Sequence, residues 1–424
     1  MASAAAGLRQ LVQSYRYAYP SARAKALKSL LLSDRQLEKV YDSEGLKGAV
    51  EALRDTVYGP FLEGKRSIFE LEQGLRGHLA AELSKMAEAL PGPAKTVLRE
   101  YLGRFEIENL MSILAGVHGR LPKERIQQMI TPLYLNLQPG FYERLASSKT
   151  VAEAVSFSEG TVYYKTVKEA LDAYEKSRLL AHFQTALNRL FYERVFSAIS
   201  GFSGPDMESL GRMIGVEVDL VNLKTLLRLK HDHVHPDEIM EYLIPRGYRL
   251  GPRILEDLAK AVGIEEIMAG LKGSYYHRPL SEAHRTFEKT KKDRRIIILE
   301  RALDDFQAEL GRGFEREYPL GIGPVLGYII AKNREVRKVI AALKLKDEGF
   351  SKEEMGDALH RLQHGRPRGE PHSSTRAGPF LSSGCRAHLS PFLCGISVLF
   401  PVLKAPLIVY GGKTCLLQFF SRYP

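Results

Sequence analysis

The chain has 424 residues, enough for several domains, and 44 % of them are hydrophobic, which supports a packed globular core. Its formal net charge is +11, but residues 1–355 carry only +5, because the rest holds eight Lys and Arg against two Asp and Glu. So mild an excess argues against nucleic-acid binding by residues 1–355. The three cysteines, Cys385, Cys394 and Cys415, all follow residue 355, which excludes a disulfide framework before it.

No signal peptide and no membrane span are predicted for residues 1–355. The first residues lack an apolar core of signal-peptide length. No run of about 18 apolar residues follows before residue 356.

Apolar residues recur at three- and four-residue intervals along most of the chain, which predicts helices and leaves little sign of strands. Leu71, Leu75 and Leu79 form one such row. Two further rows are Leu223, Leu226, Leu227 and Val234, and Val336, Val339, Ile340 and Leu343. Turn signals separate the predicted helices at 91–93, 138–140, 203–205 and 245–247.

Three blocks of sequence recur three times, in the order aromatic, Leu-Glu and Asn109-type. The aromatic block is 56–58, 161–163 and 274–276; the Leu-Glu block is 71–75, 183–187 and 299–303; the Asn109-type block contains Asn109, Asn222 and Lys338. The interval between the first two blocks grows by seven residues in the second copy, about two helical turns, so one helix can lengthen without turning its apolar face far. The blocks predict an all-α chain of three similar units.

In each unit we expect a short helix, a helix that ends in the aromatic block, and two longer helices carrying the other blocks. A short helix after Leu121, Val234 or Phe350 would close the unit. Two sets of acids keep the register of the three copies. Glu106, Asp219 and Glu335 are expected near helix starts, where the helix dipole favours them, with a partner contact as the alternative. Glu124, Asp237 and Glu353 lie in the closing turns.

Two motifs suggest chemistry and do not support it. GIGPVLG, 321–327, lacks the Lys-Ser/Thr of a phosphate loop, and Pro324 fits the first turn of a helix. HDHVH, 231–235, could supply a histidine pair to a metal-dependent hydrolase, but its register predicts a solvated turn before Pro236. The basic runs 289–295 and 332–338 are expected to form solvated helix faces, or else docking faces for an acidic partner.

The stretch YPLGIGPVLGYIIAKNREVRKV from Tyr318 resembles the most characteristic segment of the C-type subunit of V-type and archaeal-type ATPases, which is named d in the eukaryotic enzyme. YRYAYPSARAKALKSLLL from Tyr15 and GTVYYKTVKEALDAYEKSR from Gly160 are also similar to that family. The resemblance extends from about residue 8 to about residue 360.

The resemblance implies three helical bundles around a pseudo-threefold axis, which together form a funnel. We expect bundles at 1–140, 141–250 and 251–360. It also implies a non-catalytic subunit without cofactor, metal or small-molecule substrate, on the cytoplasmic face of the membrane. One copy would link the central-stalk subunits of D and F type to the proton- or sodium-carrying rotor ring, as a socket that transmits torque.

The six matched acids, Glu106, Asp219, Glu335, Glu124, Asp237 and Glu353, are the candidates for partner contact. The alternative function is a helical-repeat scaffold unrelated to the ATPase. Residues 361–424 do not fit the family: acids become rare and Pro401, Lys404 and Pro406 break the apolar stretch 391–412. They are expected to be disordered or the product of out-of-frame translation, with a membrane anchor as the lesser alternative.

Overall fold

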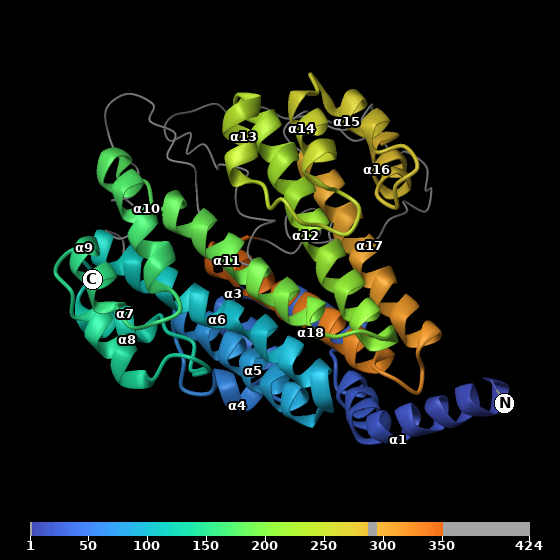
Figure 1. Ribbon diagram of the computed structural model, residues 1–424. Coiled ribbons are helices and arrows are strands. Elements are labelled where there is room, and N and C mark those ends of the chain that lie inside the picture. The colour runs from blue at the N-terminus through green and yellow to red at the C-terminus, as the bar shows by residue number, and fades with distance from the viewer. Residues whose placement is uncertain (1, 287–294, 351–424) are drawn as a thin grey trace, which may run out of the picture.

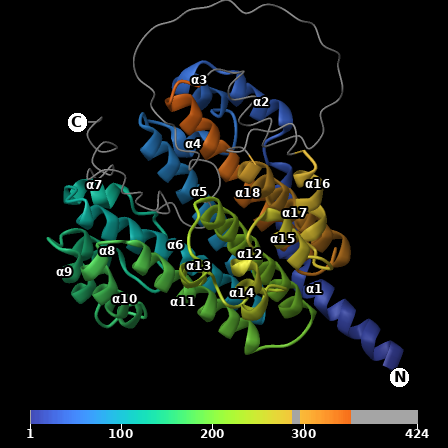
Figure 2. The same ribbon diagram turned by 90° about the horizontal axis from the view of Figure 1, so that it is seen from above.

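The computed structural model describes residues 2–286 and 295–350, and every regular element in them is a helix. The all-α prediction is therefore confirmed for this part of the chain. The first helix, α1 (Ala2–Ser29), reaches out from the body, and its N-terminal end lies at the edge of the molecule in both views (Figures 1 and 2). Residues 351–424, which hold Glu353 and the whole predicted tail, lie outside the described residues.

Six long helices make up the centre of the molecule. They come as three consecutive pairs: α5 (Ile68–Ala89) and α6 (Gly92–His118), α11 (Ala181–Ser200) and α12 (Pro205–His231), and α17 (Arg295–Glu317) and α18 (Gly323–Asp347). Each contacts the next in the chain, and α18 returns to contact α5, so that the six form a closed ring. The ring brings helices from the first and last parts of the described chain together.

A short turn joins the two helices of each pair, and proline places the start of the second one. Pro93, Pro205 and Pro324 stand in the first turns of α6, α12 and α18, where a missing N–H costs no hydrogen bond. The predicted helix start at GIGPVLG is thus confirmed. Gly323 is required there, because a Cβ atom on it would stand 2.2 Å from the carbonyl oxygen of Phe314 in α17.

Groups of short helices follow α6 and α12, and we call them lobes. The first lobe consists of α7 (Lys123–Gln128), α8 (Pro139–Ala146), α9 (Val151–Phe157) and α10 (Tyr164–Ser177). The second consists of α13 (Pro236–Tyr242), α14 (Pro252–Lys260), α15 (Ile264–Gly270) and α16 (His277–His284). The predicted short helices after Leu121 and Val234 are confirmed as α7 and α13.

A third group of short helices precedes the ring in the chain and packs against its last helix. It consists of α2 (Asp34–Asp42), α3 (Gly45–Ala52) and α4 (Gly59–Leu62), of which α2 and α3 contact α18. Ser33 and Ser67 form capping boxes that start α2 and α5. The last helix of the ring is therefore covered by the first part of the chain.

The prediction that each aromatic block ends a helix is wrong, because each block lies in the turn before a helix. Tyr58, Tyr163 and Tyr276 immediately precede the first residues of α4, α10 and α16. Their rings are buried, which explains the position: a tyrosine at the turn can reach inward while the chain reverses. The longer interval in the second copy is taken up by α10, with 14 residues against four in α4.

The predicted apolar rows form the core. Leu71, Leu75 and Leu79 are buried in α5, and Val336, Val339, Ile340 and Leu343 are buried in α18. The helices α6, α12 and α18 are buried on almost every side, because each is enclosed by long helices and by a group of short ones.

Candidate functional site

The carboxylate of Glu106, in the middle of α6, holds the loop that leads into α8. It accepts hydrogen bonds from the backbone N–H groups of Leu135, Asn136 and Leu137 at 2.7–2.9 Å. The Tyr163 hydroxyl donates to its other oxygen at 2.8 Å. One acid thus fixes both the loop between α7 and α8 and the turn before α10.

The same contact occurs at α12 and α18. Asp219 accepts from the backbone N–H groups of Arg249 and Leu250 at 2.7 and 3.2 Å, and from the Tyr276 hydroxyl at 2.6 Å. Glu335 accepts from the backbone N–H of Leu32 and from the Tyr58 hydroxyl. We call these three acid–tyrosine contacts.

The spacing along the chain shows what differs between the three acid–tyrosine contacts. In the first two the tyrosine follows its acid by 57 residues. In the third it precedes its acid by 277 residues. The first part of the chain therefore serves α18 as a lobe serves the long helix that precedes it, and this contact closes the ring.

Matched asparagines strengthen the first two attachments. Asn109 donates to the Thr131 carbonyl at 2.9 Å and accepts from its N–H at 2.8 Å. Asn222 makes the same pair of bonds with Ile244, at 2.8 Å each. An amide side chain that binds both the backbone N–H and the carbonyl of one residue fixes the loop in two directions. Lys338 stands at this place in the third copy.

The prediction that Glu106, Asp219 and Glu335 lie near helix starts is wrong. Each lies in mid-helix, and Glu106 and Asp219 have 0 % exposed surface. The cost of burying these carboxylates is offset by hydrogen bonds from N–H groups of a segment far away in the sequence, and not by the helix dipole. In this structure the three carboxylates bind this chain's own segments.

Burial sets the electrostatics of these contacts. It raises the pKa of Asp219, although the Tyr276 hydroxyl and the loop N–H groups oppose that shift. It also raises the pKa of Tyr58, Tyr163 and Tyr276, and the neighbouring carboxylates add to the effect, so each hydroxyl remains a donor.

The third contact has a cation that the other two lack. Lys332 lies 2.9 Å from the Tyr58 hydroxyl oxygen and 3.3 Å from Glu335, with 2 % exposed surface. Burial lowers the pKa of Lys332, and Glu335 opposes that shift. Glu335 accepts from one backbone N–H only, so the lysine supplies the compensation that loop N–H groups give elsewhere.

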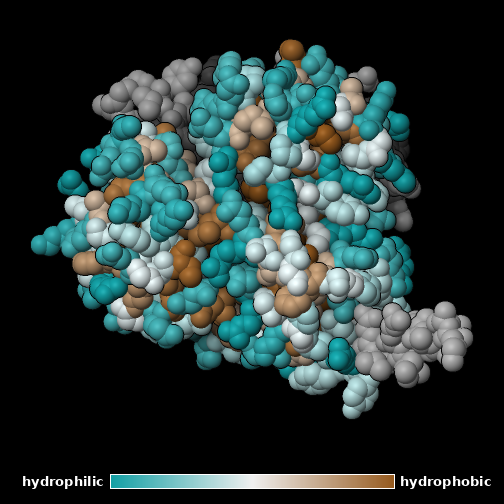
Figure 3. Space-filling view, in the orientation of Figure 1, coloured by the Kyte–Doolittle hydropathy of each residue, from teal (hydrophilic) through white to brown (hydrophobic). Residues whose placement is uncertain are grey.

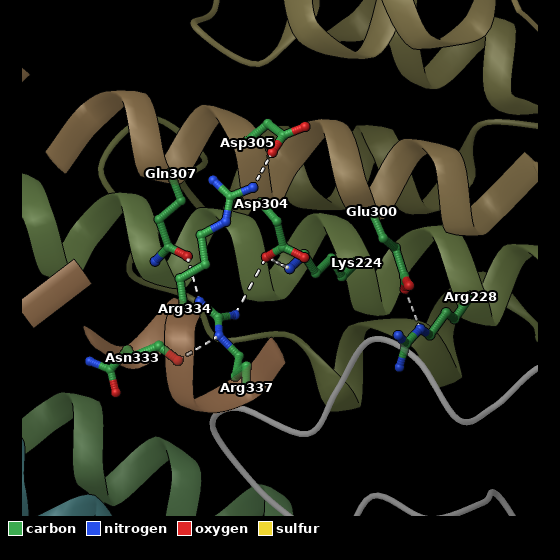
Figure 4. A network of polar contacts seen from close by, with 9 residues as sticks. All are labelled: Lys224, Arg228, Glu300, Asp304, Asp305, Gln307, Asn333, Arg334 and Arg337. Atoms are coloured by element: carbon green, nitrogen blue, oxygen red, sulfur yellow. Dashed lines mark hydrogen bonds and ion pairs between the residues drawn. The ribbon is translucent and has the colours of Figure 1, made fainter. Parts of the chain in front are cut away.

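The basic run 332–338 is not a solvated face, so that prediction is wrong. Arg334 pairs with Asp305, and Arg337 lies 3.4 Å from Asp304, which also binds Lys224 of α12 at 2.6 Å (Figure 4). Burial raises the pKa of Asp304, but Lys224 and Arg337 outweigh it, and the net pKa is lowered. The cations of α18 thus join it to α17, and Asp304 of α17 also binds a cation of α12.

Two junctions between successive helix pairs are fastened by an ion pair to the matched Leu-Glu block. Lys344 of α18 binds Glu72 of α5 at 2.7 Å, and Arg228 of α12 binds Glu300 of α17 (Figure 4). Between α6 and α11 the block offers Gln184, whose Oε1 atom is buried and has no hydrogen-bond partner among the residues that the structure describes. That junction is held by apolar packing around Phe183 and Leu187 and by an ion pair outside the block, between Arg194 of α11 and Glu100 of α6 at 2.9 Å.

A second set of buried charges lies around α6. Arg104 pairs with Glu217 of α12 at 3.0 Å, and Tyr101 also donates to Glu217. Glu108 lies 3.4 Å from Arg76. Burial raises the pKa of Glu108 to about 7, against the opposing effect of the two arginines. The burial of Arg76 and Glu217 could not be predicted from the sequence, because nothing in the repeated blocks indicates which of their polar residues face the interior.

Two of the remaining candidate acids lie on the surface. Glu124 and Asp237 are exposed in the first turns of α7 and α13, and Ile126 and Ile239, two residues further on, anchor those helices in the core. Glu353 lies outside the described residues. The structure therefore separates the five acids that it describes into three buried ones that bind this chain's own segments and two exposed ones, Glu124 and Asp237.

The histidine run is a solvated turn, as predicted. His231 ends α12, His233 adopts a positive φ, and His235 begins α13, all exposed. Within residues 2–286 and 295–350, no group of three His, Cys, Asp or Glu side chains is arranged to hold a metal ion. No helix in the same ranges is long and apolar enough to cross a membrane.

The face drawn in Figure 3 is mainly hydrophilic over the two lobes, with apolar side chains visible between hydrophilic ones across the middle of the molecule. Large exposed apolar residues occur in the lobes, such as Tyr134, Val162 and Tyr275, and again around α1. Surfaces suited to partners are therefore present at both places.

Known proteins give these features their context. Residues 20–358 match the model of the ATP synthase (C/AC39) subunit family. The C-type subunit of the A-type ATP synthase of Methanocaldococcus jannaschii is 31 % identical over 350 residues, which cover 82 % of this chain and 86 % of that protein. The proteins of the same name from Methanothermobacter thermautotrophicus and Thermococcus onnurineus are each 29 % identical, over 81 % of this chain and 88 % and 90 % of theirs.

These matches cover the closed ring, both lobes and the short helices that close the ring. A scaffold unrelated to the ATPase and a histidine-ligated hydrolase do not agree with them. The chain belongs to the C/AC39 family of ATP synthase subunits, which are non-catalytic structural components of a rotary complex.

Proposed function

We propose that this chain is the socket of the central rotor, which receives the central stalk at one end and sits on the membrane rotor ring at the other. The observation that carries this proposal is the ring of six helices, which closes where α18 packs against α5 and is fastened by the third acid–tyrosine contact, between α18 and the turn before α4. A part that transmits torque must resist opening. A ring with a buried fastening where its ends meet distributes the load, whereas an open row of helices would not.

Stiffness follows from the kind of contacts in the ring. Packed helical interiors deform little. The ion pairs Lys344–Glu72 and Arg228–Glu300 join helices of different pairs, and side-chain hydrogen bonds tie each lobe to the long helix before it. We infer three bundles around a pseudo-threefold axis, with the long helix pairs as the wall of the funnel. One copy per complex on the cytoplasmic face is part of the proposal.

We further propose that Glu124 and Asp237 contact a basic partner. Both are exposed acids at the lobe end of a long buried helix, where a docked stalk or ring would meet rigid structure. Reversing their charge should weaken assembly without unfolding the chain, because neither side chain contributes to the core.

The test is co-purification of tagged full-length chain with the D- and F-type stalk subunits and with the rotor ring. Wild-type chain should retain both. The double variant E124K/D237K should lose one of them, while E143K/D257K, with two exposed lobe acids reversed on α8 and α14, should retain both. Failure of the wild-type chain to bind either partner would refute the socket. Equal binding by the two variants would remove Glu124 and Asp237 only.

A further inference from the structure

The positive excess of the chain's main part is confined to its beginning. Residues 1–33 contain Arg9, Arg16, Arg23, Lys25 and Lys28 and no acid before Asp34. They therefore account for the whole net charge of +5 carried by residues 1–355, and residues 34–355 are neutral overall. Nearly all of this cationic segment is helix α1.

One face of α1 holds it to the body. Tyr17, Ser21 and Ala24 are buried, at helical spacing, and α1 contacts α18 along this face. The Ser21 hydroxyl donates to the carbonyl of Gly321 at 2.7 Å, and Lys28 pairs with Glu315 at 2.5 Å. The second half of α1 is therefore fixed in its position on the body.

The opposite face of α1 presents tyrosine and cations to solvent. Tyr15 is 85 % exposed and Tyr19 is 62 % exposed, one helical turn apart. Arg16 and Lys25 are exposed on the two flanks of this face. Lys25 also donates to the carbonyl of Pro319 at 3.4 Å, and neither cation belongs to an ion pair of the described residues. Arg23 donates to the Tyr19 hydroxyl at 3.0 Å, which places a third cation on the aromatic pair.

Two apolar turns lie beside α1. The turn between α17 and α18 is bonded to α1 through Ser21 and carries Leu320, which is 64 % exposed. The turn between α11 and α12 carries Phe202, 44 % exposed, and leads to Asp206, which hydrogen-bonds Tyr17. Figure 1 shows both turns at the end of the molecule from which α1 projects.

We propose that this end of the molecule, the α1 surface made of Tyr15, Arg16, Tyr19, Lys25, Phe202 and Leu320, binds the anionic surface of a lipid bilayer. A basic helix without acids, with tyrosines exposed on one side, suits the boundary between lipid headgroups and acyl chains. Phe202 and Leu320 on the adjoining turns would add shallow apolar contacts.

An acidic protein partner fits less well. An acidic protein would have to place its carboxylates opposite individual cations of α1. Exposed tyrosines, and arginines that form no ion pair with the described residues, suit instead an anionic lipid surface, whose headgroups are not held at fixed positions. Nucleic acid would require cations spread over a larger face, and the rest of residues 1–355 has no net charge.

Vesicle flotation with the full-length chain tests this surface directly. We expect binding to vesicles of phosphatidylcholine containing about 30 % phosphatidylglycerol, weakening as salt rises, and little binding to phosphatidylcholine alone. The variant R16Q/K25Q should bind the anionic vesicles about thirty-fold less, since each cation near such a surface contributes about a fivefold factor. The matched control R253Q/K272Q, which removes two exposed cations from the second lobe, should bind like wild type.

A second variant separates the apolar contribution from the charge. Y15S/Y19S should lower binding to the anionic vesicles about tenfold and leave the helical circular dichroism and melting temperature unchanged. Equal binding to neutral and anionic vesicles, or wild-type binding by R16Q/K25Q, would overturn the proposal. A third result would also overturn it: a variant of this surface that binds vesicles like wild type but no longer binds the rotor ring in detergent. That result would assign the surface to a protein partner. None of these measurements depends on the chain transmitting torque, so the lipid-binding proposal can fail while the socket proposal stands, and the reverse.

Discussion

Removing the Glu106 carboxylate tests whether the acid–tyrosine contacts hold the lobes in place. In Glu106→Ala the N–H groups of Leu135, Asn136 and Leu137 lose their acceptor, and the Tyr163 hydroxyl loses its own. Each buried donor left without a partner costs about 1–3 kcal/mol, with the lower end applying where water can enter. We therefore expect a loss of about 4–6 kcal/mol in the free energy of unfolding.

The assay is urea unfolding followed by circular dichroism at 222 nm, with the slope compared between variants to check that the transition is the same. Glu106→Gln keeps the shape and one acceptor oxygen, and should lose about half as much. Tyr163→Phe removes one hydrogen bond to a charged acceptor and should lose about 1.5–3 kcal/mol. Glu143→Ala, an exposed acid on α8, is the control and should stay within about 0.5 kcal/mol of wild type.

A loss below about 1 kcal/mol for Glu106→Ala would refute the reasoning, because it would mean that the loop finds other acceptors at no cost. A double-mutant cycle between Glu106 and Tyr163 gives a second criterion. If the two losses simply add, the residues are not coupled and the contact is not a unit.

Three further perturbations test other parts of the interior. The pKa of Glu108 is raised to about 7 in the folded chain, so the stability that comes from its protonated form is full below the unfolded pKa and is lost as the pH rises through 7. Glu108→Gln cannot ionise, so between pH 4 and pH 8 its free energy of unfolding should rise relative to wild type by up to about 3 kcal/mol. A difference between the two proteins that does not change with pH would contradict this. Arg228→Met leaves Glu300 buried without its cation and should cost about 3 kcal/mol, whereas Arg54→Ala, in an exposed pair, should cost under about 0.5 kcal/mol; equal losses in urea would count against a structural role for the buried pair. Gly323→Ala would force its Cβ into a backbone oxygen of α17 and should lower the melting temperature by several degrees, while an unchanged melting temperature would show that the α17–α18 turn can widen.

The repeating blocks predicted which residues matter but not how they meet. Glu106 and Tyr163 belong to separate blocks in the sequence, and each was matched to its counterparts by register alone. That the acid of one copy binds the tyrosine of the next could not be deduced, because 57 residues of lobe lie between them and the path of a lobe is not encoded in periodicity.

The helix starts were mispredicted for a physical reason. The helix α6 begins at Gly92, far before Glu106, and is buried on nearly all sides. A helix enclosed by others has no polar face, so its sequence lacks the amphipathic pattern from which a start is recognised. Glu106 is therefore a conspicuous acid in an otherwise apolar stretch, and it wrongly indicates that a helix starts close to it.

The basic run of α18 was misassigned for a similar reason. A cluster of cations usually indicates a solvated surface. The acids that neutralise Arg334 and Arg337 lie on α17, about 30 residues earlier, at positions with no distinguishing mark. Tertiary packing decides such pairs, and a single sequence contains no record of it.

The contact between Tyr58 and Glu335 also bears on how the chain is made. Synthesis proceeds from the N-terminus, so residues 32–62 leave the ribosome long before α18 exists. The lobes can attach to α6 and α12 soon after they emerge, because each follows its helix directly. The first segment alone must wait for almost the entire chain, and during that delay its buried face is available to chaperones.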